Sequence, residues 1–187
     1  YELLLGISDR IAADPVLSAP DYWIQPQERD RCEYEGEWYG IGSCWVAPHF
    51  YYNKSLFDEL GIEPPSNDPD EAWTWDEFLE IARQLTVDTN GKHPGEAGFD
   101  YDSIDRWGAL WPTWWIPLHA AVQSNGADWV DPQTGKIALD NPAAMEALQR
   151  VADLTLVHQV ALSQAAFDTL GMAEAEFLST KKVGLYN

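Results

Sequence analysis

The clearest pattern of apolar and polar positions lies in residues 51–86, where it predicts two helices joined by a proline-rich turn. The first helix begins after Asn53, a favourable N-cap residue, and ends before Gly61, which can adopt the left-handed conformation of a C′ residue. Prolines at positions 64 and 65 cannot continue this helix. Its apolar face holds Leu56, Phe57 and Leu60.

The second helix is predicted by a capping box that opens at Thr74. In such a box the threonine oxygen and the carboxylate of Glu77 accept hydrogen bonds from backbone N–H groups that the helix leaves unpaired. Trp73 and Phe78 occupy the two positions of a hydrophobic staple at the same end. The apolar positions then repeat with helical spacing at Phe78, Ile81, Ala82 and Leu85. This helix therefore has one apolar face that must pack against another element.

A third and longer helix is predicted to open at Asn141 and Pro142, a cap residue followed by proline at the first helical position. Its expected apolar face consists of Ala144, Met145, Leu148, Val151, Ala152 and Thr155. Because three one-sided helices need a common sheet or each other, the pattern predicts a mixed α/β lobe. We expect one core to contain Leu56, Phe57, Leu60, Phe78, Ile81, Leu85, Leu148 and Val151.

Short β-prone segments separate these helices. The turn signal Glu35-Gly36 between aromatic residues predicts a hairpin. Residues 41–53 are also β-prone, but a glycine and a proline interrupt them, so they cannot form a regular central strand. Further short strands are expected at 107–110, 129–130, 136–139 and 183–186.

The order YYNKSLFDELGIEPP, then TWDEFLEIARQLT, closely resembles a block found in extracellular solute-binding proteins of ABC importers. More narrowly, it is similar to the sugar-binding class typified by maltose-binding protein. The resemblance continues through NGADWVDPQTGKIALDNPAAMEALQRVADL and covers residues 34–187. The sequence departs from the family pattern at Gly42, where the hinge motif usually has proline, and at Lys181, where glycine is usual.

This resemblance implies a periplasmic-binding-protein-like (type II) α/β lobe, helix-rich with a small mixed sheet, in a chain that is an internal fragment of a two-lobe protein. It assigns residues 1–38 to the end of the first lobe and a connection, 39–53 to the strand that crosses the hinge, and 54–187 to an incomplete second lobe. Half of a cleft lacks the contacts of the opposite lobe. We therefore expect the chain to bind ligand weakly in isolation.

Composition narrows the classes of partner. The chain has 187 residues, with 11 basic and 31 acidic side chains and a formal net charge of −20. Nucleic acid is a poor partner because phosphate binding needs a basic face. No apolar run reaches the about 18 residues that a membrane-spanning helix needs. The two cysteines, Cys32 and Cys44, match no zinc spacing and are either paired across a hairpin or two separate buried thiols.

Nucleophilic and metal chemistry have little support in the sequence. The four histidines are scattered, and neither a Gly-x-Ser-x-Gly elbow nor a phosphate loop is present. Residues 88–91 resemble the start of a calcium loop, but Lys92 stands where an oxygen ligand is needed, and a structural turn is favoured. With 31 carboxylates, a pair at glycosidase separation would occur by chance. We therefore expect no catalysis, no metal and no cofactor.

Ten tryptophans are the remaining chemical signal. Four of them flank prolines or glycine at predicted strand ends and helix starts, positions that face clefts in α/β lobes: Trp45, Trp111, Trp114 and Trp115. Flat aromatic faces can stack on a pyranose, although any one of the four is also compatible with a core position. The resemblance places Trp45 near the hinge and Trp114 and Trp115 near a ligand-stacking aromatic. We expect all four to line one concave surface.

The resemblance implies a function as well. Such a protein binds a mono- or oligosaccharide outside the cytoplasmic membrane, in the periplasm or as a cell-surface lipoprotein, and delivers it to the permease subunits of an ABC transporter. It implies a monomer and allows a lipid anchor outside these 187 residues. Composition alone leaves two alternatives, a carbohydrate-active hydrolase with tryptophan-lined subsites and a carboxylate pair, and a lectin-like structural module without a hinge.

Overall fold

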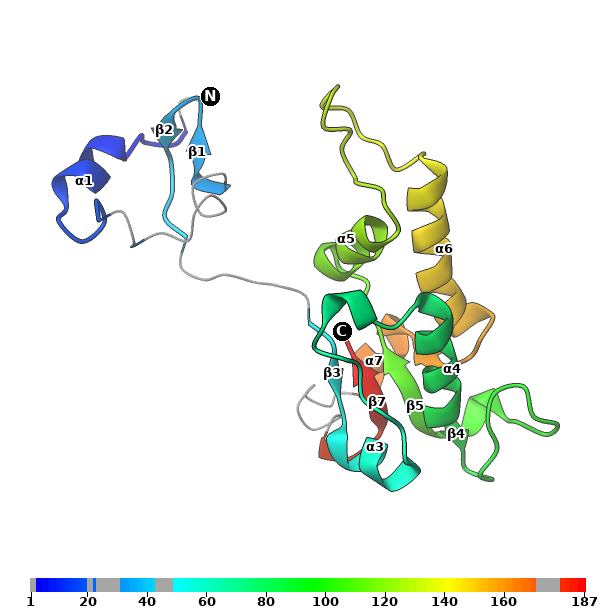
Figure 1. Cartoon of the computed structure of the whole chain (residues 1–187). Helices are drawn as coiled ribbons and strands as arrows, with labels where there is room; N and C mark the ends of the chain where they lie inside the picture. The colour runs from blue at the N-terminus through cyan, green and yellow to red at the C-terminus, as the bar shows by residue number, and fades with distance from the viewer. Residues whose placement is uncertain (1–2, 20–21, 23–30, 43–48, 171–178) are drawn as a thin grey trace. The chain divides into compact units, whose positions relative to one another are not determined.

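The computed structural model describes residues 3–19, 22, 31–42, 49–170 and 179–187 (Figure 1). The chain divides into two compact units, Tyr1–Ala47 and Pro48–Asn187, each of which is described by itself. The predicted assignment of residues 1–38, 39–53 and 54–187 to a first lobe, a hinge strand and a second lobe remains a prediction. No helix in the described parts of the chain has both the length and the apolar character to cross a membrane.

The first unit combines a short helix with a hairpin. Helix α1 spans Ser8–Ala13, and the hairpin pairs β1 (Glu33–Tyr34) with β2 (Glu37–Trp38). The two turn residues between the strands have φ angles of 52° and 84°, as a two-residue hairpin turn of the primed type requires. This confirms the predicted hairpin. The backbone N–H of Ile7 donates to the Trp38 carbonyl at 2.7 Å, which ties the segment before α1 to the hairpin.

The second unit is built on a mixed sheet of five short strands in the order β3-β7-β5-β4, with β6 paired to β5. Strands β6 and β7 run parallel to β5, whereas β3 is antiparallel to β7 and β4 is antiparallel to β5. The strands are β3 (Tyr51–Tyr52), β4 (Val87–Asp88), β5 (Ile104–Leu110), β6 (Ala161–Leu162) and β7 (Val183–Tyr186). The predicted strands at 107–110 and 183–186 are confirmed. The expected pairing between 129 and 139 is present as a single bridge from Val130 to Ile137.

Among the described residues, five helices accompany this sheet, and the caps predicted from the sequence are present at three of them. Asn53 accepts a hydrogen bond from the Leu56 N–H at 3.2 Å, and Gly61 takes the left-handed conformation with φ 67°. Asn141 caps the longest helix through the Ala143 N–H at 2.9 Å. The helices are α3 (Lys54–Leu60), α4 (Trp75–Leu85), α5 (Trp115–Ser124), α6 (Pro142–Leu156) and α7 (Gln164–Leu170), with 3-10 turns at Pro69–Glu71 and Tyr101–Ser103.

The capping box of α4 forms as predicted. The Thr74 oxygen accepts from the Glu77 N–H at 3.3 Å, and a Glu77 carboxylate oxygen accepts from the Thr74 N–H at 2.8 Å. The other end of α4 is fixed by Thr86, whose hydroxyl donates to the Ala82 carbonyl at 2.7 Å and accepts from the Gly108 N–H at 2.9 Å. A side chain at Gly108 would put Cβ 2.0 Å from the Ala82 carbonyl oxygen, so glycine is what lets β5 approach α4.

The main core lies between the sheet and helices α3, α4 and α6. Its largest members include Leu56, Phe57, Phe78, Leu85 and Leu154, all buried in one cluster with Val151. Ile81 packs against this cluster while remaining partly exposed. Five of the eight predicted core residues are therefore buried together: Leu56, Phe57, Phe78, Leu85 and Val151.

Two predicted core positions are wrong. Leu60 is exposed, because it lies in the last turn of a seven-residue helix whose first turn carries the buried residues. Leu148 packs, half-buried, on a separate cluster formed by Val122, Ala144 and Ala147, between α5 and α6. The predicted face of α6 is also rotated, since Met145 is exposed and the buried positions are Ala144, Ala147, Val151 and Leu154.

Asp88 closes a structural turn after α4. Its buried carboxylate accepts backbone N–H groups of Asn90 and Lys92, both at 2.8 Å, and of Asp100 at 2.9 Å. The segment that resembled a calcium loop is thus organised by its own backbone, as the sequence favoured. Among the described residues, no cluster of His, Cys, Asp and Glu could hold a metal ion. Cys32 is a free, half-buried cysteine, and Cys44 lies outside the described residues, so the structure gives no support to the alternative in which the two pair across a hairpin.

Candidate functional site

The three parallel strands of the sheet end at one edge, and the chain leaves each of them there. Strand β5 ends at Leu110 and leads into α5, β6 ends at Leu162 just before α7, and β7 ends at Tyr186. In open α/β sheets, the crevice outside the carboxyl ends of parallel strands is the usual place for a ligand. The structure has a cavity on each face of the sheet at this edge.

The smaller cavity has a volume of about 320 Å³, at the low end of the range of about 300–1,000 Å³ for small-molecule pockets. Residues from β5, the loop before α5, α7 and β7 line it: Leu110, Pro112, Thr113, Trp114, Gln164, Phe167 and Tyr186. Leu110 forms a small apolar cluster with Leu162 and Val183, and Phe167 packs against that cluster. Hydroxyl and amide groups come from Thr113, Gln164 and Tyr186, so the cavity combines an aromatic face with neutral polar groups.

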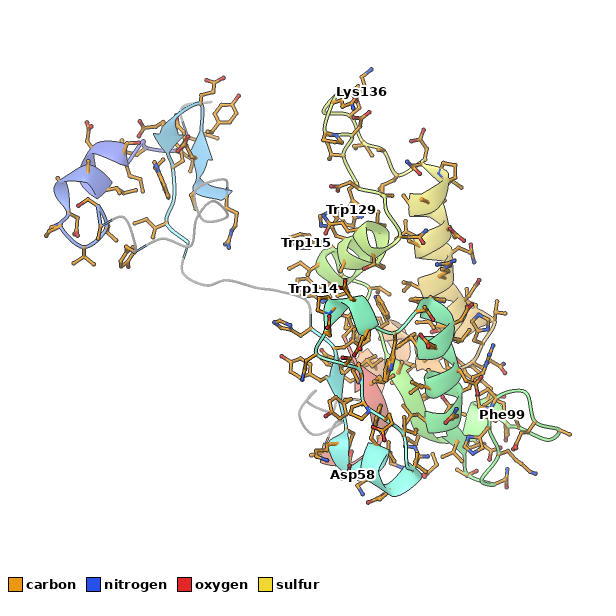
Figure 2. All side chains as sticks on the ribbon, in the orientation of Figure 1. Asp58, Phe99, Trp114, Trp115, Trp129 and Lys136 are labelled. Atoms are coloured by element: carbon orange, nitrogen blue, oxygen red, sulfur yellow. The ribbon has the colours of Figure 1, made fainter. Side chains whose placement is uncertain are left out.

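Trp114 lines this cavity, and Trp115 follows it at the start of α5; both residues are labelled in Figure 2. Trp114 is the N-cap residue of α5 and has an extended backbone, and Trp115 is the first helical residue. Their rings meet edge to face, with centroids 6.2 Å apart and an interplanar angle of 86°. The two residues are 50% and 58% exposed, respectively, which leaves large aromatic faces open to solvent.

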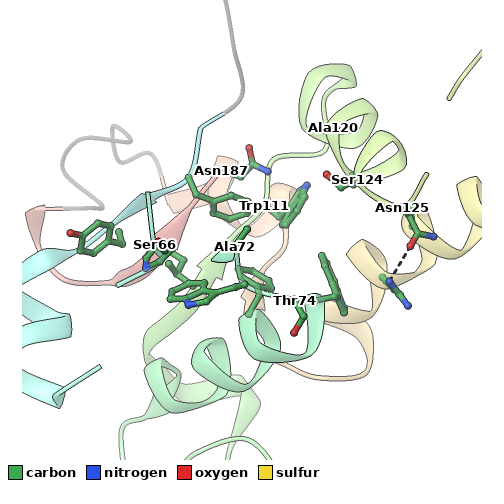
Figure 3. Close-up of a pocket in the computed structure, with 18 residues that line it drawn as sticks. Ser66, Ala72, Thr74, Trp111, Ala120, Ser124, Asn125 and Asn187 are labelled. Carbon is green, nitrogen blue, oxygen red and sulfur yellow. Dashed lines mark hydrogen bonds between the residues drawn. The ribbon is translucent and has the colours of Figure 1, made fainter. Parts of the chain in front are cut away.

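The larger cavity, of about 600 Å³, lies on the opposite face (Figure 3). Leu185 lines it while Tyr186 lines the smaller cavity, and successive side chains of a strand point to opposite faces of a sheet. Trp111 forms part of its wall but is only 8% exposed, and its ring centroid lies 5.2 Å from that of Phe50 and 5.6 Å from that of Trp75. Trp111 is therefore mainly a core residue. Its indole N–H is buried without a hydrogen-bond partner among the described residues.

The structure separates the predicted tryptophans that it describes. Trp114 lines the smaller cavity, Trp115 lies next to it with its ring against that of Trp114, and Trp111 lies in the core beside the larger cavity. Trp45 lies outside the described residues. Sequence reasoning did not select Thr113, Gln164, Phe167 or Tyr186 as site residues. For Tyr186 the available signal was its place at the end of the predicted strand 183–186. For Gln164 and Phe167 the sequence held no such signal, since nothing in it indicated that α7 begins beside that strand end.

Charged groups are scarce at both cavities. Among the described residues that line them, Arg150 is the one charged side chain, and its Nη1 donates to the side-chain amide oxygen (Oδ1) of Asn125 at 3.2 Å, as drawn in Figure 3. No Asp or Glu is among the described residues that line either cavity. A glycosidase needs two carboxyl groups flanking the scissile bond. The described lining residues therefore offer aromatic surface for stacking and side chains for hydrogen bonding.

The fold is that of a type II periplasmic-binding-protein-like lobe. An ABC substrate-binding protein of Listeria monocytogenes, solved in complex with cycloalternan, superposes with a TM-score of 0.69 at 22% identity, covering 98% of this chain and 42% of that one. The maltose/maltodextrin-binding domain of Bdellovibrio bacteriovorus, solved with maltotriose, gives a TM-score of 0.58 at 20% identity over 98% and 40% of the two chains.

Sequence comparison places the chain within a family. The family described as bacterial extracellular solute-binding protein matches residues 7–174, and the chain belongs to it. An arabinooligosaccharide-binding protein of Halalkalibacterium halodurans is 31% identical over 127 residues, which are 68% of this chain and 24% of that protein. The chain thus spans about a quarter of the length of this curated relative. The family consists of solute-binding proteins.

Proposed function

We propose that the chain forms part of a carbohydrate receptor that serves an ABC importer outside the cytoplasmic membrane, and that Trp114 and Trp115 stack on the sugar. The observation that carries this proposal is the pair of solvent-exposed indole rings at the carboxyl edge of the parallel strands. Membership of the extracellular solute-binding family and the sugar-related names of similar proteins support it.

The chemistry of the cavity suits a neutral sugar. A pyranose or furanose has an apolar face of C–H groups and an edge of hydroxyls. Trp114 offers a flat surface for the apolar C–H face of the sugar. Thr113, Gln164 and the Tyr186 hydroxyl offer hydrogen-bond donors and acceptors for the sugar hydroxyls. A stacked aromatic contributes on the order of 0.5–1.5 kcal/mol beyond the area it buries.

The same proposal includes the partners of the whole protein. The ligand is a mono- or oligosaccharide, and the protein hands it to the permease subunits of the transporter as a monomer, without chemical change to the sugar. Ligand binding would favour a closed arrangement of two lobes about the hinge, to which the segment with Trp45 contributes. Attachment to the cell surface by a lipid anchor is compatible with this role.

The test is a titration of the 187-residue chain with arabinotetraose and maltotetraose, followed by tryptophan fluorescence and NMR. We expect at least one of the two tetrasaccharides to bind. Trp114→Ala and Trp115→Ala should each weaken this binding about tenfold or more, because each removes an indole ring and the apolar area that the ring buries against the sugar. Tyr34→Ala serves as the matched control, since Tyr34 is an exposed aromatic of the first unit.

Two outcomes would contradict the proposal. If both tryptophan variants bind sugar as the unchanged chain does, the site is elsewhere. If shorter sugars with new reducing ends are released during the titration, the protein is a hydrolase rather than a receptor.

A further inference from the structure

The geometry of the two exposed tryptophans limits what a single sugar can contact. Their ring planes are nearly perpendicular, at 86°, so one sugar ring cannot stack on both. Trp114 lines the smaller cavity and Trp115 does not. The exposed face of Trp115 is therefore positioned for a different part of a ligand than the part that enters the cavity.

A polar pair lies one helical turn beyond Trp115. His119 follows Trp115 by four residues on α5, a spacing that places two side chains side by side on one helix face. The Nε2 atom of His119 lies 2.9 Å from a carboxylate oxygen of Asp128. The two side chains are 29% and 49% exposed, so both are accessible from solvent.

Trp129 holds this pair in place. Its ring centroid lies 5.2 Å from that of His119, and its side chain packs against the cluster between α5 and α6. Its backbone N–H also donates to the Asp128 carboxylate, at 2.6 Å. The hydrogen bond with His119 has the largest effect on the pKa of Asp128, and the hydrogen bond from the Trp129 N–H has the next largest. Both lower this pKa below its usual value. Asp128 is consequently an ionised hydrogen-bond acceptor at neutral pH, already in contact with His119 and with the Trp129 N–H.

We propose that Trp115, His119 and Asp128 form a second sugar subsite outside the cavity, an inference that rests on the proposed function. A ligand that fills both subsites is an oligosaccharide, which is therefore the preferred ligand. One sugar unit enters the cavity at Trp114, and the next unit lies over Trp115 with its hydroxyls toward the imidazole and the carboxylate. Within the described residues, the Nδ1 atom of His119 makes no hydrogen bond, so it is the ring nitrogen that a sugar hydroxyl can reach.

The test compares arabinose with arabinotetraose, and glucose with maltotetraose, on the unchanged chain and on His119→Ala. We expect a tetrasaccharide to bind more tightly than its monosaccharide. We expect His119→Ala to lower the ratio of the two affinities roughly threefold to tenfold, the size of effect that one or two lost hydrogen bonds produce. In NMR spectra, the imidazole signals of His119 should shift on addition of the tetrasaccharide and stay in place on addition of the monosaccharide.

Gln149→Ala is the control for the loss of an exposed side-chain hydrogen bond that lies away from the proposed subsite. Gln149 likewise makes an exposed side-chain hydrogen bond, to Asp153 at 2.7 Å on α6, and the variant should leave the affinity ratio unchanged. If His119→Ala lowers the thermal unfolding midpoint but leaves the ratio and the imidazole shifts as they were, the pair only anchors the 128–139 segment and the second subsite is wrong. If no sugar of either length binds, the proposed function itself has failed.

Discussion

The carboxylate of Asp88 illustrates how a single buried charge is made favourable. Burial by itself raises the pKa of this group, but the backbone N–H groups of Lys92, Asp100 and Asn90 donate to the ionised form and outweigh that effect, so that the pKa is lowered. A lowered folded-state pKa means that the ionised group stabilises the fold above the unfolded-state pKa of about 3.9. This stability is lost as the pH falls through the folded-state value.

We therefore expect Asp88→Asn to lower the thermal unfolding midpoint at neutral pH, because an amide has one acceptor oxygen and brings two N–H donors toward backbone donors. The difference from the unchanged chain should shrink as the pH approaches the acid range. Asp58→Asn is the control, since Asp58 forms an exposed pair with Lys54 within one helix. Equal effects of the two substitutions at every pH would contradict this account of the turn.

At the scale of the element, helix α4 depends on its first turn. Its capping box satisfies backbone N–H groups at the start of the helix, and its buried face of Phe78, Leu79, Ala82 and Leu85 joins the main core. Loss of the box would fray the turn that carries Trp75, one of the aromatic neighbours of Trp111.

Thr74→Ala should reduce the free energy of unfolding by about 0.5–2 kcal/mol, the usual cost of losing an N-cap side chain. Urea unfolding followed by far-UV circular dichroism measures this change. Thr74→Ser keeps a hydroxyl acceptor and should restore most of the stability. A serine variant as unstable as the alanine variant would assign the effect to the lost methyl group instead of the cap.

At the scale of the whole molecule, the cavities of the second unit are open at the carboxyl edge of the sheet, and the chain spans only about two fifths of the solved proteins that share its fold. Receptors that close around a ligand gain affinity from contacts on both sides of the cleft and from stabilisation of the closed state. Contacts from one side alone leave the bound sugar partly hydrated.

The 187-residue chain should accordingly bind tetrasaccharides weakly, in the range that needs NMR rather than calorimetry for detection. The titrations of the tryptophan and histidine variants would then be compared by chemical-shift changes at high sugar concentration. Nanomolar affinity of this chain in calorimetry would mean that the site is complete within these residues and that no second face is required.

The sequence by itself determined the features that depend on neighbours along the chain. The caps at Asn53, Thr74 and Asn141, the left-handed Gly61 and the hairpin turn at 35–36 all form as predicted, since each is fixed by side-chain and backbone groups a few residues apart. The resemblance carried by these same segments also indicated the family and the fold.

Only the tertiary structure decided which apolar residues are buried and which tryptophans face solvent. Leu60 and Leu148 have the spacing of core residues, but burial depends on what packs over a position, and the main core does not reach them. Trp111 and Trp114 both follow the end of β5 at Leu110 and are three residues apart, yet Trp111 enters the core and Trp114 opens onto a cavity. The cavity itself joins Leu110 to Gln164 and Tyr186, and pairing of distant strands, which local sequence does not encode, brings them together.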